Sequence, residues 1–472
     1  MSPRPDYSGI RATVMGLGSF GGGVAAARFL AAQGARVSVT DLRDKSQLLD
    51  SLHALQNCPI EQLVTGQHPE ELFRDCQLLI VNPAVPPGNP LVELARTQGA
   101  EISTEINLFL RHQPGRLIAV SGSNGKSTTS ALTATLLQHS FPDVNTFLGG
   151  NIGGSLLEEL HRIQPDDFVV LELSSFQLHR IDVSFFHPQA AVLTGFSPNH
   201  LDWHGSLTDY RTAKQKLFGS ACRDSCGIVP AETEADFSPR HDWRIRGRKH
   251  VFGLQDTGED GAFLQSGMLL LRTAAGRRED TCRLQIPRTL PGAHNAGNIA
   301  AACCAAWLCE ADPAGFENAL RGFAPLPHRL QKTAACNGIE FWDDSKATTP
   351  AAAAAALKLF SGRAIVIAGG ASKGVDPEPL AAAIRTHAKS AVLIGESASV
   401  LQRLLNADHH KQRAACQIAS DFESGFRMAV ESATSGDIVL LSPGCASYDW
   451  FRDYRHRGEV FCKLVSEWIE SQ

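Results

Sequence analysis

The stretch "VSGSNGKSTTSAL", from Val120 to Leu132, decides the fold class of this chain. The apolar run "RLIAVSG" that leads into it predicts a strand, and the residues after it predict a helix, so a glycine-containing turn joins the two. Backbone N–H groups in such a turn, with the positive end of the helix, bind phosphate groups. Here Lys126 can reach the outer phosphates and Ser127 can bind Mg²⁺. The strict P-loop pattern has glycine where Val120 stands, so a purely structural turn is the alternative interpretation.

Another glycine-rich turn, the first along the chain, lies about a hundred residues earlier, in "VMGLGSFGGG" from Val14 to Gly23, so the turn at Val120 to Leu132 is the second glycine turn. "GLGSFG" satisfies the pattern G-x-G-x-x-G after a predicted strand, and Asp41 ends the next strand, where a ribose-binding acid lies in dinucleotide folds. Taken alone, this pattern indicates NAD. A turn that only packs a helix on a sheet, or a site for a different diphosphate, explains the residues as well.

Three blocks of alternating strand and helix signals follow one another along the chain. This order predicts an α/β fold with parallel sheets and right-handed crossovers. We predict a Rossmann-like N-terminal domain over residues 1–113, a central P-loop-type ATPase domain with a mainly parallel sheet over 114–325, and a Rossmann-like C-terminal domain over 326–472. The polar, turn-rich stretch from Pro239 to Arg283 predicts an antiparallel excursion in the central block.

Composition indicates a soluble, cytoplasmic protein. Of the 472 residues, 43% are hydrophobic and 20% charged, and the net charge of -5 argues against a basic face for nucleic acid. No apolar run reaches the length that a bilayer requires, and the N-terminus lacks the apolar core of a signal peptide. The 12 cysteines include no CxxC pair, which favours reduced thiols over a zinc ribbon.

Polar residues follow several predicted strands, at the edge where ligands bind in open α/β sheets. Glu172, in "LELSSFQL", can hold Mg²⁺ or can cap a helix. The stretch "SPNHLDWHGSLTDYRTAKQKLF" follows another strand and carries His200, Asp202, His204 and Lys214, which favours a site over isolated structural histidines. In the third block, cations near loop glycines suit an anionic ligand. The residues in question are Arg329, Asp344, Lys346 and Lys373.

The chain resembles the Mur ligases of peptidoglycan synthesis. The motifs "SGSNGKST", "GGNIG", "LELSSFQL", "SPNHLDWH", "YRTAK", "PGAHNAGN", "PHRLQ", "DDSKATTP" and "SPGCAS" occur in this order over nearly the whole chain. The resemblance implies an ATP-dependent ligase that adds D-glutamate to UDP-N-acetylmuramoyl-L-alanine through an acyl phosphate, in cell-wall biogenesis and hence in cell shape and division. On this view the first glycine turn binds the UDP of the sugar substrate. The alternatives are another amide ligase of the superfamily, such as an L-glutamate-adding or folylpolyglutamate synthase-like enzyme, and an NAD-binding protein.

The resemblance also implies residue roles. The residues implied to bind ATP are Ser123, Asn124, Gly125, Lys126, Ser127, Thr128, Asn295, Asn298, Arg329, Asp344 and Lys346. Those implied for the UDP substrate are Gly16, Ser19, Asp41, Arg43, Asn151, Ser174 and His200. Those implied for glutamate are Arg329, Thr348, Lys373, Ser447 and Tyr454. The implied catalytic residues are Lys126, Glu172, His200 and Lys214.

Two Mg²⁺ sites are implied, with Lys214 carbamylated by CO₂, and the enzyme is expected to be a monomer. The implied metal ligands are Ser127, Glu172, His200 and Lys214. The sequence departs from the family pattern at three places. Phe20 replaces a small hydroxyl residue in the first glycine turn, Ser372 replaces an acid before Lys373, and Tyr454 stands where phenylalanine is usual.

Overall fold

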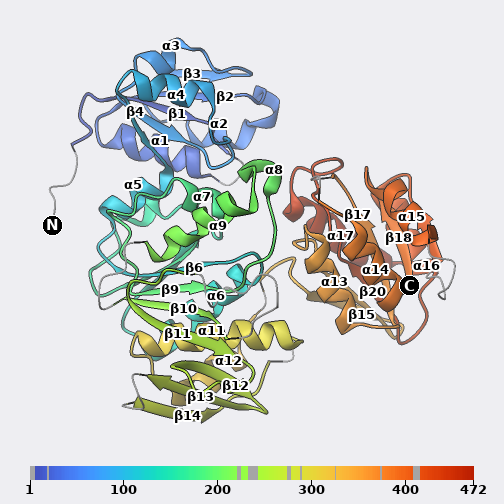
Figure 1. Cartoon of the computed structure of the whole chain (residues 1–472). Helices are drawn as coiled ribbons and strands as arrows, with labels where there is room; N and C mark the ends of the chain where they lie inside the picture. Colours follow the sequence, from blue (N-terminus) through green and yellow to red (C-terminus); the bar gives the residue numbers. More distant parts are fainter. Residues whose placement is uncertain are drawn as a thin grey trace. The chain divides into compact units, whose positions relative to one another are not determined.

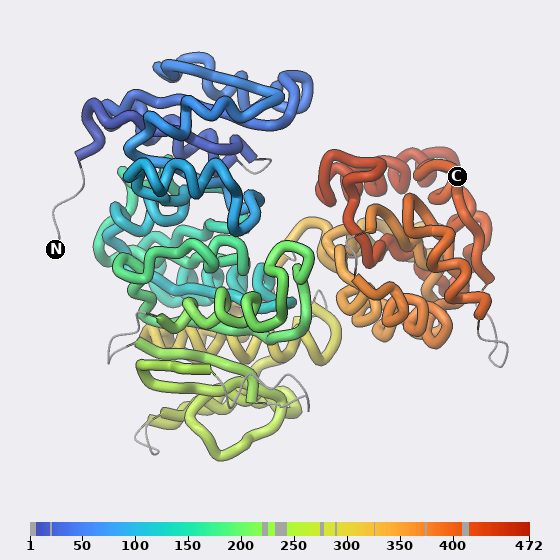
Figure 2. Tube along the Cα trace, turned by 45° about the horizontal axis from the view of Figure 1, so that its top comes forward, coloured from blue at the N-terminus to red at the C-terminus, as the bar shows by residue number. Residues whose placement is uncertain are grey.

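The computed structural model describes residues 6–18, 21–219, 225–231, 243–273, 278–287, 290–324, 326–372, 375–407 and 415–472. It contains three β-sheets, each covered by helices (Figures 1 and 2). The chain divides into two compact units, one of Met1–Gln285 with Ala293–Gly322 and one of Ile286–Gly292 with Phe323–Gln472. The first unit holds two of the sheets, and the second holds the third.

The first sheet has the strand order β3-β2-β1-β4-β5, and all its strand pairs are parallel. Its strands are β1 (Arg11–Met15), β2 (Arg36–Asp41), β3 (Ile60–Thr65), β4 (Leu78–Val81) and β5 (Glu101–Ser103). Its helices are α1 (Gly22–Ala32), α2 (Leu49–Ala54), α3 (Glu71–Arg74), α4 (Pro90–Thr97) and α5 (Glu105–His112). The order reverses at β1, because β2 and β4 lie on its two sides. The glycine turn after β1 therefore lies at the switch point, where α/β sheets bind ligands.

The central sheet has the order β14-β13-β12-β11-β10-β9-β6-β8-β7, and it is parallel from β12 to β7. Its parallel strands are β6 (Arg116–Ser121), β7 (Thr146–Gly150), β8 (Phe168–Glu172), β9 (Ala190–Leu193), β10 (Cys226–Pro230), β11 (Arg248–Gly253) and β12 (Gly261–Gln265). The antiparallel strands β13 (Met268–Thr273) and β14 (Arg278–Arg283) extend its edge. The predicted antiparallel segment, Pro239 to Arg283, is therefore antiparallel only in the pairs β12–β13 and β13–β14, because β11 pairs in parallel with both its neighbours.

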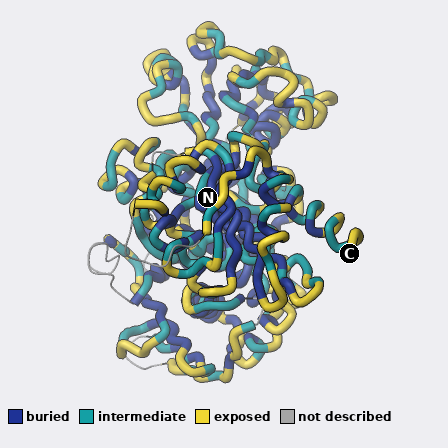
Figure 3. The backbone as a smooth tube through the Cα atoms, turned by 90° about the vertical axis from the view of Figure 1, so that its right-hand side faces the viewer, coloured by how far each residue is buried: buried dark blue, intermediate teal, exposed yellow. Residues whose placement is uncertain are grey.

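The helices of the central domain are α6 (Lys126–Ser140), α7 (Ser175–His179), α8 (Leu201–His204), α9 (Leu207–Gln215), α11 (Ala293–Leu308) and α12 (Phe316–Arg321). Strands β6, β8 and β9 are almost entirely buried. Figure 3 shows the buried backbone of the interior in dark blue. Continuous apolar strands of this kind are typical of parallel sheets that helices cover on both faces. The buried strands β6, β8 and β9 carry the second glycine turn, Glu172 and the His200 stretch at their carboxyl ends.

The third sheet has the order β15-β16-β20-β17-β18-β19, and among these described strands only the β15–β16 pair is antiparallel. Its strands are β15 (Gln331–Cys336), β16 (Ile339–Asp343), β17 (Ala364–Gly369), β18 (Ala388–Ile394), β19 (Ala415–Ile418) and β20 (Ile438–Leu441). Its helices are α13 (Pro350–Leu359), α14 (Glu378–His387), α15 (Ala398–Ala407), α16 (Phe422–Glu431) and α17 (Tyr454–Glu470). The predicted α/β class with three mainly parallel sheets is thus confirmed, whereas the domain boundaries after residues 113 and 325 stay predictions.

Within the described ranges, no helix has both the length and the apolar character needed to cross a membrane.

Candidate active site

The second glycine turn is a tight connection between β6 and α6 that only glycine can form. Gly122 has φ +151°, and a Cβ atom there would lie 2.0 Å from Thr194 Oγ1. Gly125, at the N-cap of α6, has φ +81°, and a Cβ atom there would lie 2.3 Å from Asn298 Oδ1. Val120, where the strict pattern has glycine, is a fully buried residue of β6. The turn therefore begins after β6 and does not need glycine at that position.

The side chain of Lys126 folds back over this turn. Its Nζ atom donates to the carbonyls of Gly122 at 2.9 Å and Ser123 at 3.0 Å. Ser127, in the first turn of α6, is buried. An ammonium group and a hydroxyl group thus lie at the helix N-terminus, where N–H groups favour anions.

Lys214 reaches the same turn from α9 and is 1% exposed. Its Nζ atom donates to Gly122 O at 2.9 Å and to Ser121 Oγ at 3.3 Å. Burial, reinforced by the positive charge of Lys126, lowers the pKa of Lys214 well below its ordinary value, although Glu172 acts in the opposite direction. The structure therefore brings two lysines and a carboxylate together at the carboxyl edge of the central sheet.

Glu172 ends β8 and is 1% exposed. Its Oε1 atom accepts a hydrogen bond of 2.7 Å from Asn151 Nδ2, and the Asn151 backbone N–H donates to Glu172 O at 2.8 Å. Asn151 thus orients the carboxylate from the "GGNIG" turn after β7. Ser174 caps α7, since its Oγ atom accepts from the Gln177 N–H at 3.2 Å.

His200 lies at the N-cap of α8 with a left-handed backbone, φ +54°. Its ring lies 4.7 Å from that of Phe176 on α7. The neighbouring His204 is buried, and its Nε2 atom lies 2.9 Å from Ser175 Oγ. Burial, with His179 and Lys214 nearby, lowers the pKa of His204 to about 4, so this ring is neutral near pH 7. His204 is therefore a structural group, and His200 is the more open of the two.

Asn295 and Asn298 lie on α11, which packs against α6. Thr129 Oγ1 donates to Asn298 Oδ1 at 3.4 Å, and Asn298 Nδ2 donates to Asn295 Oδ1 at 3.3 Å. Both asparagines therefore lie beside the first turn of α6, next to Gly125.

In the first domain, Asp41 braces the first glycine turn. Its Oδ2 atom accepts from the Leu17 N–H at 2.9 Å, and Arg43 donates to both carboxylate oxygens, at 3.1 Å and 3.0 Å. Burial acts to raise the pKa of Asp41, but hydrogen bonds from Arg43 and Leu17 outweigh it, so the pKa lies below its ordinary value. Gly16 has φ +88°, as a turn at this point requires.

Two predicted site residues, Ser19 and Lys373, lie outside the described residues, as does Phe20.

In the third domain, Asp344 and Lys346 follow β16. Asp344 accepts from Ser442 Oγ at 2.8 Å and from the Leu330 N–H at 3.2 Å. Burial raises the pKa of Asp344 to about 7 against the lowering effect of these hydrogen bonds and of Arg329. Lys346 Nζ lies 3.7 Å from the ring centroid of Tyr454, a cation–π contact.

Ser447 is buried in the loop after β20, and Thr348 is partly exposed in the loop before α13. Arg457 on α17 holds these two loops together. Its guanidinium donates to Ser345 O at 2.9 Å and to the carbonyls of Ala446 at 3.2 Å and Cys445 at 3.3 Å. The predicted third-domain residues thus gather on neighbouring loops at one edge of the third sheet.

We call the second glycine turn, Gly122 to Gly125, the phosphate turn. Several residues that shape it had no predicted role in the sequence. Thr194 Oγ1 donates to the carbonyls of Ser121, at 3.2 Å, and Asn124. The Tyr210 hydroxyl lies 2.9 Å from Ser123 Oγ. Thr194 follows β9 directly, so the rule that ligands gather at strand ends could have found it. Tyr210 is the first residue of the motif "YRTAK", but no role was predicted for its hydroxyl group.

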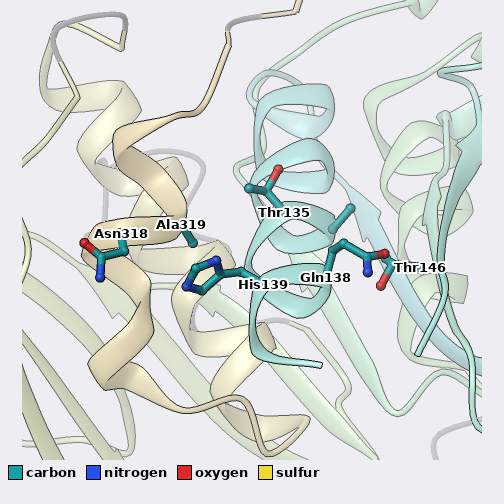
Figure 4. A pocket seen from close by; sticks show the side chains of 7 residues that line it. Thr135, Gln138, His139, Thr146, Asn318 and Ala319 are labelled. Atoms are coloured by element: carbon teal, nitrogen blue, oxygen red, sulfur yellow. The ribbon is translucent and has the colours of Figure 1, made fainter. Parts of the chain in front are cut away.

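A separate pocket of about 550 Å³ lies toward the C-terminal end of α6 (Figure 4). Thr135, Gln138 and His139 line it from α6, and Asn318 and Ala319 line it from α12. None of the predicted site residues lines this pocket. In the described part of the chain, no group of three or more histidine, cysteine or acidic side chains is placed to hold a metal ion.

Three family descriptions match the chain. They are "Mur ligase MurD-like, N-terminal domain" over residues 10–104, "Mur ligase middle domain" over 120–306 and "Mur ligase, glutamate ligase domain" over 328–445.

Curated relatives match at nearly full length. A UDP-N-acetylmuramoylalanine--D-glutamate ligase of Roseiflexus sp. (strain RS-1) is 39% identical over 97% of this chain and 98% of its own. A protein of the same name from Koribacter versatilis (strain Ellin345) is 34% identical over 99% of both chains.

Solved structures share the fold. The MurF ligase of Thermotoga maritima, in complex with ADP, has a TM-score of 0.57 at 16% identity and covers 98% of this chain and 96% of its own. A murein peptide ligase from Psychrobacter arcticus has a TM-score of 0.54 at 17% identity and covers 96% and 99%.

Proposed function

The chain belongs to the Mur ligase family, and we propose on this premise that it adds D-glutamate to UDP-N-acetylmuramoyl-L-alanine with cleavage of ATP. The observation that carries the proposal is the near-full-length identity, 39% and 34%, to two relatives that bear the name of this ligase. The product is a peptidoglycan precursor. We further propose that the enzyme acts in the cytoplasm as a monomer, with neither nucleic acid nor a membrane as a partner.

The reaction joins a carboxylate to an amine in two steps. An oxygen of the alanyl carboxylate attacks the γ-phosphorus of ATP, and the bond to the β-phosphate oxygen breaks to release ADP. The amine nitrogen of glutamate then attacks the carbonyl carbon of the acyl phosphate, loses a proton, and expels inorganic phosphate as the amide forms. Phosphorylation is needed because an unactivated carboxylate has no adequate leaving group.

The phosphate turn is the proposed site of ATP. Its N–H groups and Lys126 supply positive charge where the phosphates must lie, since charge moves from the γ-phosphate during transfer. Asn298 lies beside Gly125 and contacts Asn295, which supports the proposal that both asparagines bind the nucleotide. The other members of this proposed site on the turn are Ser123, Asn124, Ser127 and Thr128.

Mg²⁺ would supply charge neutralisation between the two anionic reactants when bound. We propose that Ser127 and Glu172 would hold one ion, because a hydroxyl and a carboxylate supply the hard oxygen ligands that Mg²⁺ prefers. We propose His200 and Lys214 for a second ion, with Lys214 as its carbamate. A cationic lysine would repel the metal, whereas a carbamate offers oxygen ligands.

The proposed sugar-nucleotide site lies at the first glycine turn and the edge of the central sheet. Asp41 holds the turn by accepting a hydrogen bond from the Leu17 N–H, and it orients Arg43 by accepting from its guanidinium. Asn151 donates a hydrogen bond to Glu172, so we propose that it contacts the sugar substrate next to the phosphate site. The proposed members are Gly16, Ser19, Asp41, Arg43, Asn151, Ser174 and His200.

The proposed glutamate site lies on the loops of the third domain. Lys346 and Tyr454, in contact with each other, present a cation and an aromatic face. Asp344, Lys346 and Arg329 are proposed to reach ATP as well. The proposed members for glutamate are Arg329, Thr348, Lys373, Ser447 and Tyr454.

An amino-acid panel tests the proposal. The purified protein, with ATP and Mg²⁺, is offered UDP-N-acetylmuramoyl-L-alanine and, one at a time, D-glutamate, L-glutamate and other amino acids. We expect phosphate release and a product of the amide's mass with D-glutamate. A parallel assay offers a pterin-glutamate substrate with L-glutamate in place of the UDP sugar. Turnover that prefers L-glutamate, or turnover of the pterin-glutamate substrate alone, would replace this proposal by one of the related ligases.

A further inference from the structure

A short loop of the first domain, residues 82–86 with the sequence "NPAVP", supports the first glycine turn. Asn82 Nδ2 donates to Gly16 O at 3.3 Å, and Asn82 Oδ1 accepts from the Ala84 N–H at 2.9 Å. A Cβ atom on Gly18 would lie 2.6 Å from Asn82 Nδ2, so the turn packs directly on this side chain. The position of loop 82–86 therefore determines the shape of the proposed UDP site.

The same loop is held from the central domain by two side chains. Trp203 Nε1 donates to Ala84 O at 3.3 Å, and an Arg180 guanidinium nitrogen donates to Pro86 O at 3.0 Å. The Arg180 guanidinium also lies over the Trp203 ring, 5.7 Å from its centroid. Arg180 is the C-cap of α7 and Trp203 belongs to α8, whose N-cap is His200. Helices α7 and α8 are labelled in Figure 1.

Trp203 is connected to His200 through both its backbone and its ring. The Trp203 N–H donates to His200 O at 3.2 Å within the single turn of α8. The Trp203 ring lies 4.8 Å from that of Phe176, which in turn lies 4.7 Å from that of His200. Because α8 is one turn long, a shift of Trp203 must also move His200.

We propose that Trp203 and Arg180 are positioning residues that couple the UDP site of the first domain to His200. The proposal rests on the proposed function and adds to it a link between two sites on different sheets. When the UDP sugar occupies the first turn, loop 82–86 is held in place, and its carbonyls hold α8 so that His200 faces the reacting groups. Coupling of two sites is reciprocal, so Mg²⁺ at the His200 site and the UDP sugar each tighten the binding of the other.

The test is Trp203→Phe, which removes the indole N–H but keeps a ring against Phe176. We expect the KM for UDP-N-acetylmuramoyl-L-alanine to rise about three- to tenfold, the effect of one lost neutral hydrogen bond, with the KM for ATP unchanged within about twofold. At low UDP-sugar concentration, the Mg²⁺ concentration for half-maximal rate should also rise. A merely structural role would lower thermal stability without this split between the two KM values.

Two further variants keep the test specific. Trp342→Phe removes a comparable indole hydrogen bond, to Glu340 Oε2 at 2.9 Å in the third domain, and should leave both KM values unchanged. Asn82→Ala combined with Trp203→Phe should raise the UDP-sugar KM by less than the product of the single effects, because both act through one loop.

The outcome for Trp203→Phe decides the proposal. Unchanged UDP-sugar KM and Mg²⁺ dependence, a parallel rise in both KM values, or independent effects in the double variant would each overturn it. Failure of the proposed function is distinguishable, since it would appear as absent ligation in the unaltered protein.

Discussion

The buried amine of Lys214 is the residue whose chemical state matters most to the proposed mechanism. It lies against Gly122 O and Ser121 Oγ and close to the charges of Lys126 and Glu172. Burial favours the neutral amine, and only the neutral amine reacts with CO₂. The reaction forms an N–C bond and releases one proton, and the carbamate then carries a negative charge into a site that must hold Mg²⁺.

We therefore expect Lys214→Ala to lose on the order of 10²-fold or more in kcat, because a metal ligand disappears. Formate or acetate should restore part of the rate by supplying a carboxylate in the space left by the side chain. Lys214→Arg, which keeps the positive charge but cannot form the carbamate, is the matched control and should show no such rescue. Full activity of Lys214→Ala in CO₂-depleted buffer would exclude a catalytic carbamate.

The phosphate turn requires glycine at position 125, because the backbone there is left-handed and lies close to Asn298. Gly125→Ala must accommodate a Cβ atom 2.3 Å from Asn298 Oδ1 in a left-handed backbone. We expect the KM for ATP to rise at least about tenfold. Backbone strain at position 125 and displacement of the Asn298 side chain would both disturb the N–H groups that are proposed to bind the phosphates. Steady-state kinetics with ATP and with the UDP sugar as the varied substrates provides the measurement.

Gly99→Ala isolates the cost of the backbone conformation alone. Gly99 has φ +89° and no atom within 4 Å of an added Cβ. This variant should lose stability by about 1 kcal/mol while both KM values stay normal. Equal kinetic effects of Gly99→Ala and Gly125→Ala would contradict a specific role for the contact between α6 and α11.

Helix α5 carries a pH-dependent contribution to stability at its first residue. Glu105 accepts a hydrogen bond from Ser155 Oγ, across from the first domain to the loop after β7. Burial raises the pKa of Glu105 to about 7, although the Ser155 hydrogen bond acts to lower it. Between about pH 4.5 and pH 7, the Glu105 carboxyl group therefore stays protonated in the folded protein, whereas in the unfolded chain it has an ordinary glutamate pKa and is ionised.

The contribution of Glu105 to the free energy of unfolding should therefore be largest below about pH 4.5. It should fall by about 1–3 kcal/mol as the pH rises to 7. Glu105→Gln should remove this slope, as urea unfolding between pH 4.5 and pH 8 can measure. Glu93→Gln, an exposed position on α4 paired with Arg96, serves as the control and should leave the slope intact. An unchanged slope in Glu105→Gln would show that other groups produce it.

The sequence predicts the elements of the site better than the contacts between them. Lys126, Glu172 and His200 were found because each lies at the end of a strongly apolar strand or within a few residues after it. Parallel strands bring their carboxyl ends to one edge of the sheet. Weakly apolar strands such as β7 and β5 gave no such signal, because glycines in one and the short length of the other hide the strand pattern.

Contacts between distant segments could not be predicted. Trp203 and Ala84 are 119 residues apart, and Thr194 and Asn124 are 70 residues apart. Neither pair has a local pattern that joins its members. Tertiary packing alone decides such pairs, and an indole N–H or a threonine hydroxyl is compatible with many partners.

At the scale of the whole molecule, the two glycine turns lie in two sheets of one unit, and we propose that each turn binds a different nucleotide. Both turns follow the strand at which their sheet's order reverses. Their surroundings differ, because Asp41 at the first turn is engaged by Leu17 and Arg43 rather than open to a ribose. On the chain's match to the Mur ligase domains, we propose a UDP diphosphate rather than NAD at the first turn and ATP at the second.

We therefore expect UDP-N-acetylmuramoyl-L-alanine, and not NAD, to raise the melting temperature. A ligand that binds only the folded state at about 100 times its Kd adds about 2.7 kcal/mol to the free energy of unfolding. Gly18→Ala should abolish this rise while leaving the response to ATP and Mg²⁺ intact, because its Cβ atom would lie 2.6 Å from Asn82 Nδ2, in the first turn only. A melting temperature raised by NAD and indifferent to the UDP sugar would reassign the first turn to a dinucleotide. Loss of both responses in Gly18→Ala would mean that the two nucleotide sites do not act separately, since a change confined to one turn would then have disabled the other.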